Sequence, residues 1–358
     1  MVKVLQVLPT LNVCGGVENY LMNYYLNMDL SDMSIDFCVH EISGQNFKED
    51  IQKRGGNIYS LPKFSVKNFR QISTQMRQIF SNNHYDIIHC HQANAAYFYF
   101  KSAKESGIKC RILHSHQAAA ADKWSHAVRN LPLLSLGKKY ANEFMACSKL
   151  AGDYLFGNKT YKVINNAVDV EKFAFNSAKR NLIREKLGLG DDFCIGHIGR
   201  FCRQKNQKFL LEVFCKFIKI RPNSKLLFIG DGESFQECVN FASKLGIKDK
   251  VLFLGSRPDA RDFYQAMDVF ALPSLYEGLP VVGVEAQYNG LTLLLSDKIT
   301  KETDFSGHCK FIPLRATDWL DSLSNSFERH HVDSTSYDIH FQAPVLKGVY
   351  SMLATKYS

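Results

Sequence analysis

The sequence predicts two α/β domains, each built on a parallel β-sheet that helices cover on both faces. Short, nearly continuous apolar runs alternate with helical stretches along the whole chain of 358 residues, and strands buried on both faces have this composition. A polar and charged stretch at residues 166–190 interrupts the alternation. The length also corresponds to two domains of ordinary size.

The first expected domain covers residues 1–165. Its first strand, at 2–8, is followed by a Gly-Gly pair and a helix over 17–26. Further apolar runs predict strands at 35–39, 86–90, 110–114, 143–147 and 161–164.

The second expected domain covers residues 166–336, and we interpret its polar start at 166–190 as an inter-domain connection. Strands are expected at 193–198, 225–229, 251–254, 269–272 and 292–295. The segment 204–220 has apolar residues at 209, 210, 213, 214, 217 and 218, which is the stripe of an amphipathic helix. In such folds ligands bind at the carboxyl ends of the strands, here in a cleft between the two domains.

Composition excludes several classes of protein. With 46% hydrophobic and 22% charged residues, the chain is neither disordered nor fibrous. No apolar run approaches the roughly 18–20 residues that span a bilayer, and the first run is too short for a signal peptide. The ten scattered cysteines include no Cys-x-x-Cys pair, so we expect reduced thiols in a cytoplasmic protein rather than a zinc site.

The positive charge is concentrated in the first half. Residues 1–165 contain 19 Lys and Arg against 12 Asp and Glu, and account for +7 of the net charge of +9. This bias suits an anionic partner such as a membrane surface, although a solvated surface without a partner explains it as well.

Two carboxylates eight residues apart, Glu277 and Glu285, flank an expected strand-to-helix turn after Pro273. A helix starting near Gly278 would offer its amino-terminal N–H groups to an anion. With fully helical spacing the carboxylates lie roughly 12 Å apart, a distance that suits the two ends of a sugar–diphosphate–ribose ligand. The alternative is a helix acid and a solvated surface glutamate.

Two further loops follow first strands. Arg200 and Lys205 lie between the strand at 193–198 and the striped helix, where they can converge on a diphosphate, although basic loops are often only surface. Gly15 and Gly16 allow backbone N–H groups to approach an oxyanion, but their spacing is not a dinucleotide fingerprint.

Two histidine pairs end neighbouring strands: His89 with His91, and His114 with His116. Strand alternation places each pair on one face. A metal site lacks a convincing acidic or thiolate ligand, and no Asp-x-Asp pair is present to coordinate a nucleotide-bound Mg²⁺ or Mn²⁺. We therefore expect His116 or His91 to hydrogen-bond substrate hydroxyls, with buried structural histidines as the alternative.

In order along the chain, these motifs resemble the family 4 retaining glycosyltransferases, which have two Rossmann-like domains facing across a cleft (the GT-B fold). The matching segments are 15–18, 114–116, 163–169, 199–206, 228–233 and 277–285. The similarity is greatest to bacterial enzymes of capsule, exopolysaccharide and O-antigen assembly. It implies that a closing helix over about 337–358 crosses back onto the first domain.

The resemblance assigns roles to the motif residues. Arg200 and Lys205 would hold the donor diphosphate, Glu285 the ribose, and Glu277 the 3- and 4-hydroxyls of the donor sugar. His116 would contact the 6-hydroxyl side of that sugar. The backbone amides that assist at the phosphates would come from Gly15, Gly16, Gly278 and Leu279.

The implied reaction is metal-independent and needs no cofactor. A hexosyl unit would move, with retained configuration, from a UDP-hexose or UDP-N-acetylhexosamine to a hydroxyl of a growing, polyprenyl-diphosphate-linked surface polysaccharide. Nucleic acid is not an expected partner, because the sequence contains basic charge but no recognisable nucleic-acid-binding motif.

Two basic and apolar segments, 64–80 and 123–139, suggest peripheral attachment to the anionic inner face of the cytoplasmic membrane. In this arrangement the apolar residues would enter the leaflet and the cations would lie near the phosphates. The alternative for both is an amphipathic helix packed on its own domain. Three other functions remain open: a sugar-nucleotide epimerase of the same fold, a phosphorylase that uses pyridoxal phosphate, and a non-catalytic subunit that binds a nucleotide sugar.

Overall fold

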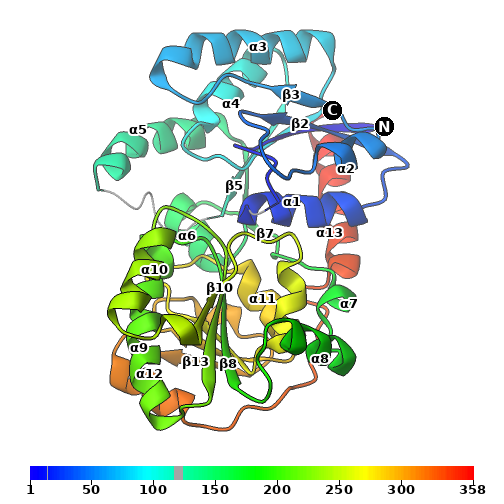
Figure 1. Cartoon of the computed structure of the whole chain (residues 1–358). Coiled ribbons are helices and arrows are strands. Elements are labelled where there is room, and N and C mark those ends of the chain that lie inside the picture. Colours follow the sequence, from blue (N-terminus) through cyan, green and yellow to red (C-terminus); the bar gives the residue numbers. More distant parts are fainter. Residues whose placement is uncertain (14, 117–123) are drawn as a thin grey trace. The chain divides into compact units, whose positions relative to one another are not determined.

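The computed structural model describes residues 1–13, 15–116 and 124–358, and their side chains except those of residues 66 and 124–130. The chain divides into two compact units (Figure 1). Unit 1 contains Met1–Ala167 and Ser336–Ser358, and unit 2 contains Val168–Thr335.

Unit 1 is built on a seven-stranded sheet of order β3-β2-β1-β4-β5-β6-β7. All its strand pairs are parallel. The strands are β1 (Val2–Val7), β2 (Met33–Val39), β3 (Ile58–Ser60), β4 (Ile87–Cys90), β5 (Cys110–Ser115), β6 (Glu143–Ala146) and β7 (Lys162–Val163). Because the strands are parallel, β4 and β5 present their carboxyl ends at one edge of the sheet.

Helices cover both faces of this sheet. On one face α1 (Gly16–Asn27) packs against the C-terminal helix α13 (Ile339–Lys356), as Figure 1 shows. On the other face α4 (Ala96–Glu105) packs between α3 (Phe69–Asn82) and α5 (Trp124–Tyr140). The remaining α-helices of unit 1 are α2 (Lys48–Lys53) and α6 (Lys149–Phe156), and a short 3-10 turn, η1 (Val66–Asn68), precedes α3. Each face has its own buried apolar core.

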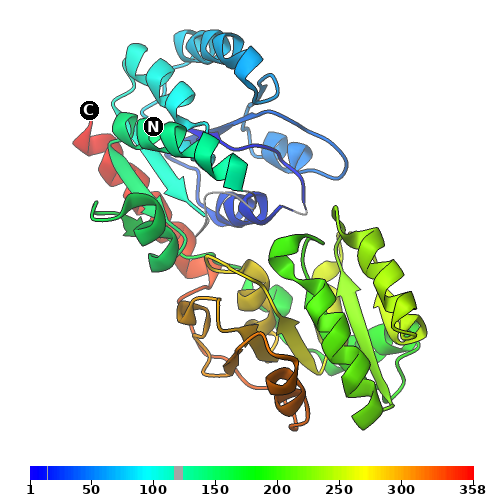
Figure 2. The same ribbon diagram turned by 90° about the vertical axis from the view of Figure 1, so that its left-hand side faces the viewer.

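Unit 2 is built on a six-stranded parallel sheet of order β10-β9-β8-β11-β12-β13. Figure 2 shows strands of this sheet with helices beside them. Its strands are β8 (Phe193–Ile198), β9 (Ser224–Ile229), β10 (Val251–Phe253), β11 (Val269–Leu272), β12 (Thr292–Ser296) and β13 (Cys309–Ile312).

The helices of unit 2 form two groups. One group, α9 (Gln207–Ile220), α10 (Phe235–Lys244) and α12 (Ala316–Leu323), packs together over one face. The second contains α7 (Val170–Phe173), α8 (Ser177–Lys186) and α11 (Val281–Tyr288), joined through the 3-10 helix η4 (Ala260–Ala266). Further 3-10 turns are η2 (Arg203–Lys205), η3 (Lys248–Lys250) and η5 (Lys301–Thr303).

The predicted class, two α/β domains with parallel sheets, is confirmed. The expected closing helix is present as α13 and belongs to unit 1. Two edge strands escaped prediction, because β3 has only three residues and β13 contains a polar Lys310. The helix expected from residue 204 begins at Gln207, after a turn in which Asn206 has a φ of 57°.

The interpretation of 166–190 as a connection was wrong for most of its length. Arg180 pairs with Asp268 at 2.6 Å, and Arg184 donates to the Ala266 carbonyl at 2.8 Å. These contacts attach α8 to the segment that precedes β11. The polar composition therefore reflects ion pairs within unit 2.

The described apolar side chains of the 64–80 segment pack within unit 1. Ile72 and Met76 are fully buried in the core, and Phe69 stacks on Phe98 at 3.9 Å between ring centroids. The expectation that these apolar groups enter a leaflet was therefore wrong, and packing on the helix's own domain is the correct alternative. In the second segment, residue 123 and the side chains of 124–130 lie outside the described residues, while Leu131 is 56% exposed.

A glycine after β9 controls how the loops of unit 2 approach each other. Gly230 has a φ of 132°, and a Cβ there would lie 2.1 Å from the carbonyl oxygen of Gly199. We expect Gly230→Ala to destabilise the protein by more than about 2 kcal/mol, measured by urea unfolding. Gly246→Ala is the matched control, because Gly246 also has positive φ but has open space around its Cβ position. Equal effects of the two substitutions would show that backbone conformation alone requires glycine.

Candidate active site

A buried ion pair joins two of the predicted site residues in unit 2. Lys205, at the end of η2, donates from Nζ to Oε1 of Glu277 at 2.6 Å. The two side chains come from the loops that follow β8 and β11, which are neighbouring strands. Their side chains are 15% and 10% exposed, so the pair is largely removed from water. The Lys205 ammonium and the Glu277 carboxylate therefore hydrogen-bond each other in place of water.

The hydrogen bonds of Glu277 leave part of its carboxylate available. Oε1 accepts from Lys205 and from the Ser274 hydroxyl at 2.8 Å, while Oε2 accepts from the Gln204 amide at 3.2 Å. A carboxylate oxygen can accept two hydrogen bonds, so Oε2 retains one acceptor position. The Lys205 ammonium has three N–H groups and uses one of them on Glu277.

The loop that carries Arg200 is shaped by a close backbone approach. The amide of Gly199 donates to the Ile229 carbonyl, and that of Phe201 to the Asp231 carbonyl, both at 2.9 Å. Gly232 allows the contact, since a Cβ there would lie 2.3 Å from the Phe201 carbonyl oxygen. The Arg200 side chain is exposed at this edge, and its backbone carbonyl accepts from Gln207 at 2.9 Å.

The second predicted carboxylate, Glu285, lies on α11. The hydroxyl of Tyr264 donates to its Oε2 at 2.6 Å. Burial raises the pKa of Glu285 to about 7, although the hydrogen bond from Tyr264 lowers it. Glu285 can therefore change its protonation state near neutral pH.

The start of α11 differs from the sequence expectation. The helix begins at Val281, after Pro280 with a φ of −71°, and not near Gly278. Gly278 and Leu279 lie in the loop before it. The assumption of fully helical spacing between Glu277 and Glu285 was therefore wrong, because the first four residues of that interval are loop.

In unit 1 a buried carboxyl lies against the predicted glycine turn. Gly15 precedes α1, and a Cβ on Gly15 would lie 2.0 Å from Oε2 of Glu18. The Thr10 hydroxyl hydrogen-bonds Oε1 of Glu18. Burial raises the pKa of Glu18. Gly16 is exposed, with no atom near its Cβ position, so its backbone is accessible.

The four strand-end histidines of unit 1 form one cluster. The ring centroids of His89 and His91 are 4.3 Å apart, and those of His114 and His116 are 4.2 Å apart. Across the strands, His89 and His114 lie at 5.1 Å, as do His91 and His116. The pairing of β4 with β5 brings them together.

The sequence left open whether His91 or His116 hydrogen-bonds a substrate hydroxyl, and the hydrogen bonds of the two residues distinguish them. His91 uses both ring nitrogens, with Nδ1 2.8 Å from Nε2 of His116 and Nε2 2.9 Å from Oε1 of Gln6. For Nδ1 of His116 no hydrogen bond to a described residue exists. Among the described residues, His91 therefore has both ring nitrogens engaged, whereas His116 has one ring nitrogen left for a further hydrogen bond.

Burial keeps this cluster uncharged. It lowers the pKa of His89 and of His116 to about 3, and the pKa values of His91 and His114 fall well below 6.5 for the same reason. One nitrogen from each of His89, His91 and His114 lies within 4.8 Å of the others, a spacing that could hold a metal ion. Hydrogen bonds within the cluster already use nitrogens of all three residues.

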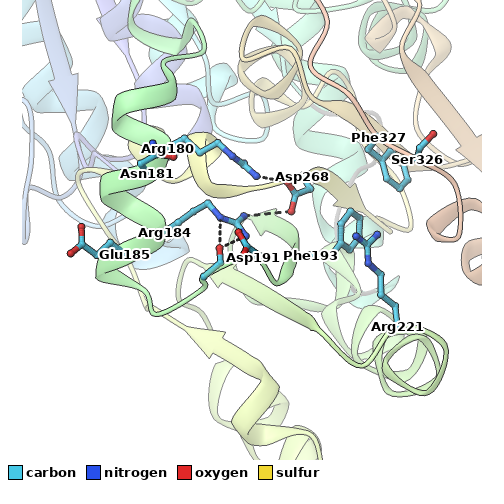
Figure 3. Close-up of a pocket in the computed structure, with 11 residues that line it drawn as sticks. Arg180, Asn181, Arg184, Glu185, Asp191, Phe193, Arg221, Asp268, Ser326 and Phe327 are labelled. Carbon is cyan, nitrogen blue, oxygen red and sulfur yellow. Dashed lines mark hydrogen bonds and ion pairs between the residues drawn. The ribbon is translucent and has the colours of Figure 1, made fainter.

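A pocket of about 710 Å³ lies elsewhere in unit 2 (Figure 3). It is lined at the amino ends of β8 and β11 by Phe193 and Asp268, together with Arg180, Arg184 and Arg221. Two of these arginines bind Asp268, and Arg221 lies over the ring of Phe193 at 4.1 Å. The pocket is thus at the opposite edge of the sheet from Glu277.

The predicted residues therefore fall into two groups. Arg200, Lys205, Glu277 and Glu285 lie on loops and a helix of unit 2, and Gly15, Gly16 and His116 lie in unit 1. The sequence analysis missed the residues that hold them. Ser274 and Gln204 could have been found as polar neighbours within the same motifs. Tyr264 gave no signal, since it stands in a mixed polar and apolar stretch outside the recognised motifs.

Comparison with known proteins defines the class. The family model for glycosyl transferases group 1 matches residues 179–308, and the family model for glycosyltransferase family 4 matches residues 14–172. A protein named glycosyltransferase EpsF in Bacillus subtilis (strain 168) is 32% identical over 311 residues, which cover 84% of this chain and 81% of that protein. The chain belongs to the family 4 glycosyltransferases.

Two further similarities concern parts of the chain or the fold. An Escherichia coli UDP-Gal:alpha-D-GlcNAc-diphosphoundecaprenol alpha-1,3-galactosyltransferase is 30% identical over 225 residues, 60% of this chain and 58% of that enzyme. The crystal structure of Anabaena Alr3699/HepE in complex with UDP-glucose has a TM-score of 0.77 at 18% identity, and covers 100% of this chain and 98% of that one. The fold is thus that of the GT-B glycosyltransferases.

The buried histidines predict acid sensitivity of unit 1. In the folded state their pKa values lie below 6.5, so the unfolded chain binds more protons, and stability falls as the pH drops from about 6.5 towards 3. Well below pH 6.5 we expect a loss of at most about 1.4 kcal/mol per pH unit for each such histidine, and a smaller loss above it. Urea unfolding between pH 7.5 and 5 measures this slope.

Two variants identify the source of the slope. His89→Gln should reduce it, because one neutral buried imidazole is removed. His84→Gln should leave it unchanged, because the His84 side chain is 93% exposed. A slope that His89→Gln does not reduce would contradict the assignment to the cluster.

Proposed function

We propose that the protein transfers a hexosyl unit from a UDP-hexose or UDP-N-acetylhexosamine to a hydroxyl of a growing cell-surface polysaccharide. The observation that carries the proposal is the buried Lys205–Glu277 pair next to the Arg200 loop, with Glu285 on the following helix. Cations for a diphosphate and carboxylates for hydroxyls lie at the edge where parallel sheets bind ligands. The relatives named for UDP-sugar transfer or bound to UDP-glucose support uracil as the base.

Each predicted site residue has a proposed role in holding the donor. Lys205 gives its remaining N–H groups to the donor diphosphate, and Arg200 grips the same group. The amides of Gly15, Gly16, Gly278 and Leu279 assist there. Glu277 accepts a sugar hydroxyl at Oε2, Glu285 accepts the ribose hydroxyls, and His116 accepts or donates on the 6-hydroxyl side.

The proposed reaction retains the anomeric configuration. Its direct form breaks the bond from sugar C1 to the phosphate oxygen, forms the bond from C1 to the acceptor oxygen, and moves the acceptor proton to the departing diphosphate. A two-step alternative needs a nucleophilic carboxylate. The three hydrogen bonds that Glu277 already accepts support the direct form, because they lower its nucleophilicity. Arg200 and Lys205 stabilise the leaving charge, so we propose that no metal or other cofactor is needed.

The acceptor is proposed to be a polyprenyl-diphosphate-linked glycan, reached by peripheral attachment at the inner face of the cytoplasmic membrane. Among the described helices, none is long and apolar enough to cross a bilayer. The E. coli relative is named for a diphosphoundecaprenol acceptor, which supports this acceptor class. Lys63, Lys67, Arg70 and Arg77 are exposed in unit 1 and could meet anionic headgroups without apolar insertion.

Calorimetric titration with UDP, GDP and ADP, each with and without Mg²⁺, tests the donor site. We expect UDP to bind without dependence on Mg²⁺. Because the pKa of Glu285 is about 7 and the ribose needs the ionised carboxylate, UDP affinity should fall up to tenfold per pH unit below about 7.

Two variants serve as controls for this titration. Glu285→Gln should weaken UDP binding and remove the part of the pH dependence that comes from Glu285. The part that comes from titration of the UDP phosphates should be the same in the wild type and the variant. Tyr264→Phe removes a hydrogen bond that lowers the pKa of Glu285, so the midpoint should move to higher pH. If none of the three nucleotides nor an intact nucleotide sugar bound, the proposed function would fail. Product analysis by NMR then separates sugar transfer with retention from epimerisation.

Vesicle binding tests membrane attachment. We expect the protein to float with vesicles that contain anionic lipid at low salt and to detach as salt is raised, since exposed cations would provide the attraction. Lys67→Glu combined with Arg70→Glu should weaken flotation several-fold without changing UDP affinity. Lys216→Glu in unit 2 is the control. Wild-type protein that ignores anionic vesicles would contradict the attachment.

A further inference from the structure

A continuous chain of hydrogen bonds runs through the buried histidine cluster of unit 1. Gln6 on β1 stands at its centre, with both ends of its side-chain amide engaged. One arm runs from Gln6 through His91 to His116. The other runs from Gln6 through Tyr350 of α13 and His89 to His114. All distances along both arms lie between 2.7 and 3.0 Å.

The amide of Gln6 fixes the direction of the first arm. Its Oε1 is only an acceptor, so Nε2 of His91 must carry the proton that it receives. A neutral imidazole has one N–H, which leaves Nδ1 of His91 as an acceptor. Nε2 of His116 must therefore be the donor across the 2.8 Å contact. The remaining nitrogen of His116, Nδ1, then has a lone pair.

The second arm accommodates this orientation of the Gln6 amide through the Tyr350 hydroxyl, which both accepts and donates. Nε2 of Gln6 donates to the Tyr350 hydroxyl at 2.8 Å, so the tyrosine proton is available to Nδ1 of His89 at 2.7 Å. His89 can then donate from Nε2 to Nδ1 of His114 at 3.0 Å. This arm ends at Nε2 of His114, which is buried without a hydrogen-bond partner among the described residues.

Reversal of His116 would require several coupled changes. A proton on Nδ1 of His116 needs a proton on Nδ1 of His91, and then the amide of Gln6 has to turn over. The oxygen of the turned amide would accept from the Tyr350 hydroxyl, so the protons of His89 and His114 would have to move as well. Gln6 and His91 are 1% and 6% exposed, so a partial reversal would leave a buried amide or imidazole unpaired, with no water to replace the lost bond. Burial also holds the pKa of both imidazoles far below neutral, so each remains in a single-proton form.

We propose that Gln6 and His91 are positioning residues that hold His116 in the form protonated at Nε2, so that Nδ1 accepts a hydrogen bond from a hydroxyl of the donor sugar. The part that concerns the sugar rests on the proposed function. The tautomer itself is a property of unit 1 and is independent of it. A sugar presenting a hydroxyl is accepted at this position, whereas one presenting only an acceptor oxygen is disfavoured.

The tautomers can be observed directly in the full-length protein labelled with ¹⁵N-histidine. Two-bond ¹H–¹⁵N spectra separate protonated from unprotonated ring nitrogens, and loss of signals in His116→Asn assigns this residue. In the wild type we expect His116 and His91 to be protonated at Nε2 only. In Gln6→Met the acceptor is lost, and both histidines should show a mixture of the two forms.

Two further variants complete the design. Tyr350→Phe frees the amide of Gln6 to turn, so it should also give a mixture at His116, and it provides the test if Gln6→Met does not fold. Tyr20→Phe is the control: the Tyr20 ring lies 5.0 Å from that of His116, but its hydroxyl has no partner among the described residues. This variant should leave the spectrum of His116 unchanged.

The results separate the two proposals. A wild-type His116 protonated at Nδ1, or one that stays purely Nε2-protonated in folded Gln6→Met or Tyr350→Phe, would overturn the positioning role whatever the enzyme does. If transfer occurs, Gln6→Met should lower kcat/KM for the nucleotide sugar about tenfold and leave the Kd for UDP unchanged, because UDP lacks the donor hexose that His116 would contact. If UDP, GDP, ADP and the intact nucleotide sugar all failed to bind while the expected tautomers were observed, the proposed function alone would be overturned.

Discussion

The burial of both faces of the two parallel sheets is the constraint on which the other features depend. Strands covered on both sides have to be apolar, so chemistry-bearing side chains collect where the strands end. In unit 2 the ends of β8 and β11 bring Lys205 to Glu277, although 72 residues separate them in the chain. In unit 1 the ends of β4 and β5 bring together two histidine pairs that are 25 residues apart.

The two units satisfy buried polar groups in different ways. In unit 2 the Lys205 ammonium lies 2.6 Å from the Glu277 carboxylate. Ser274 and Gln204 donate further hydrogen bonds to this carboxylate. Such a pair keeps charges ready for a charged ligand at the cost of desolvation. In the histidine cluster of unit 1 the polar groups are neutral imidazoles, a hydroxyl and an amide, which need partners but no countercharge. A neutral, directional arrangement suits the recognition of hydroxyl groups.

The sequence predicts features that depend on residues close together in the chain, and it does not predict contacts that form only in the folded structure. Apolar runs located most strands of both sheets, and the motif around Glu277 was visible because its residues are close together in the chain. The start of α11 was predicted three residues early, since Pro280 is compatible with the first turn and with the preceding cap. Tyr264 could not be found, because its partner Glu285 is brought to it only by packing between η4 and α11. Local patterns therefore identify the chemical groups, and tertiary structure decides their partners.

The C-terminal helix has more than a packing role in unit 1. Gln6 and Tyr350 are 344 residues apart in the chain and hydrogen-bond inside the same core. Residues Leu346, Val349 and Leu353 of α13 are buried against that face, and they fix the helix so that the Tyr350 hydroxyl reaches the amide. Because the orientation of this amide determines the tautomer of His116, the last helix of the chain controls a group at the end of β5. A polypeptide that ends before α13 would therefore lack part of the core of unit 1 and also the hydrogen bond that orients its histidines.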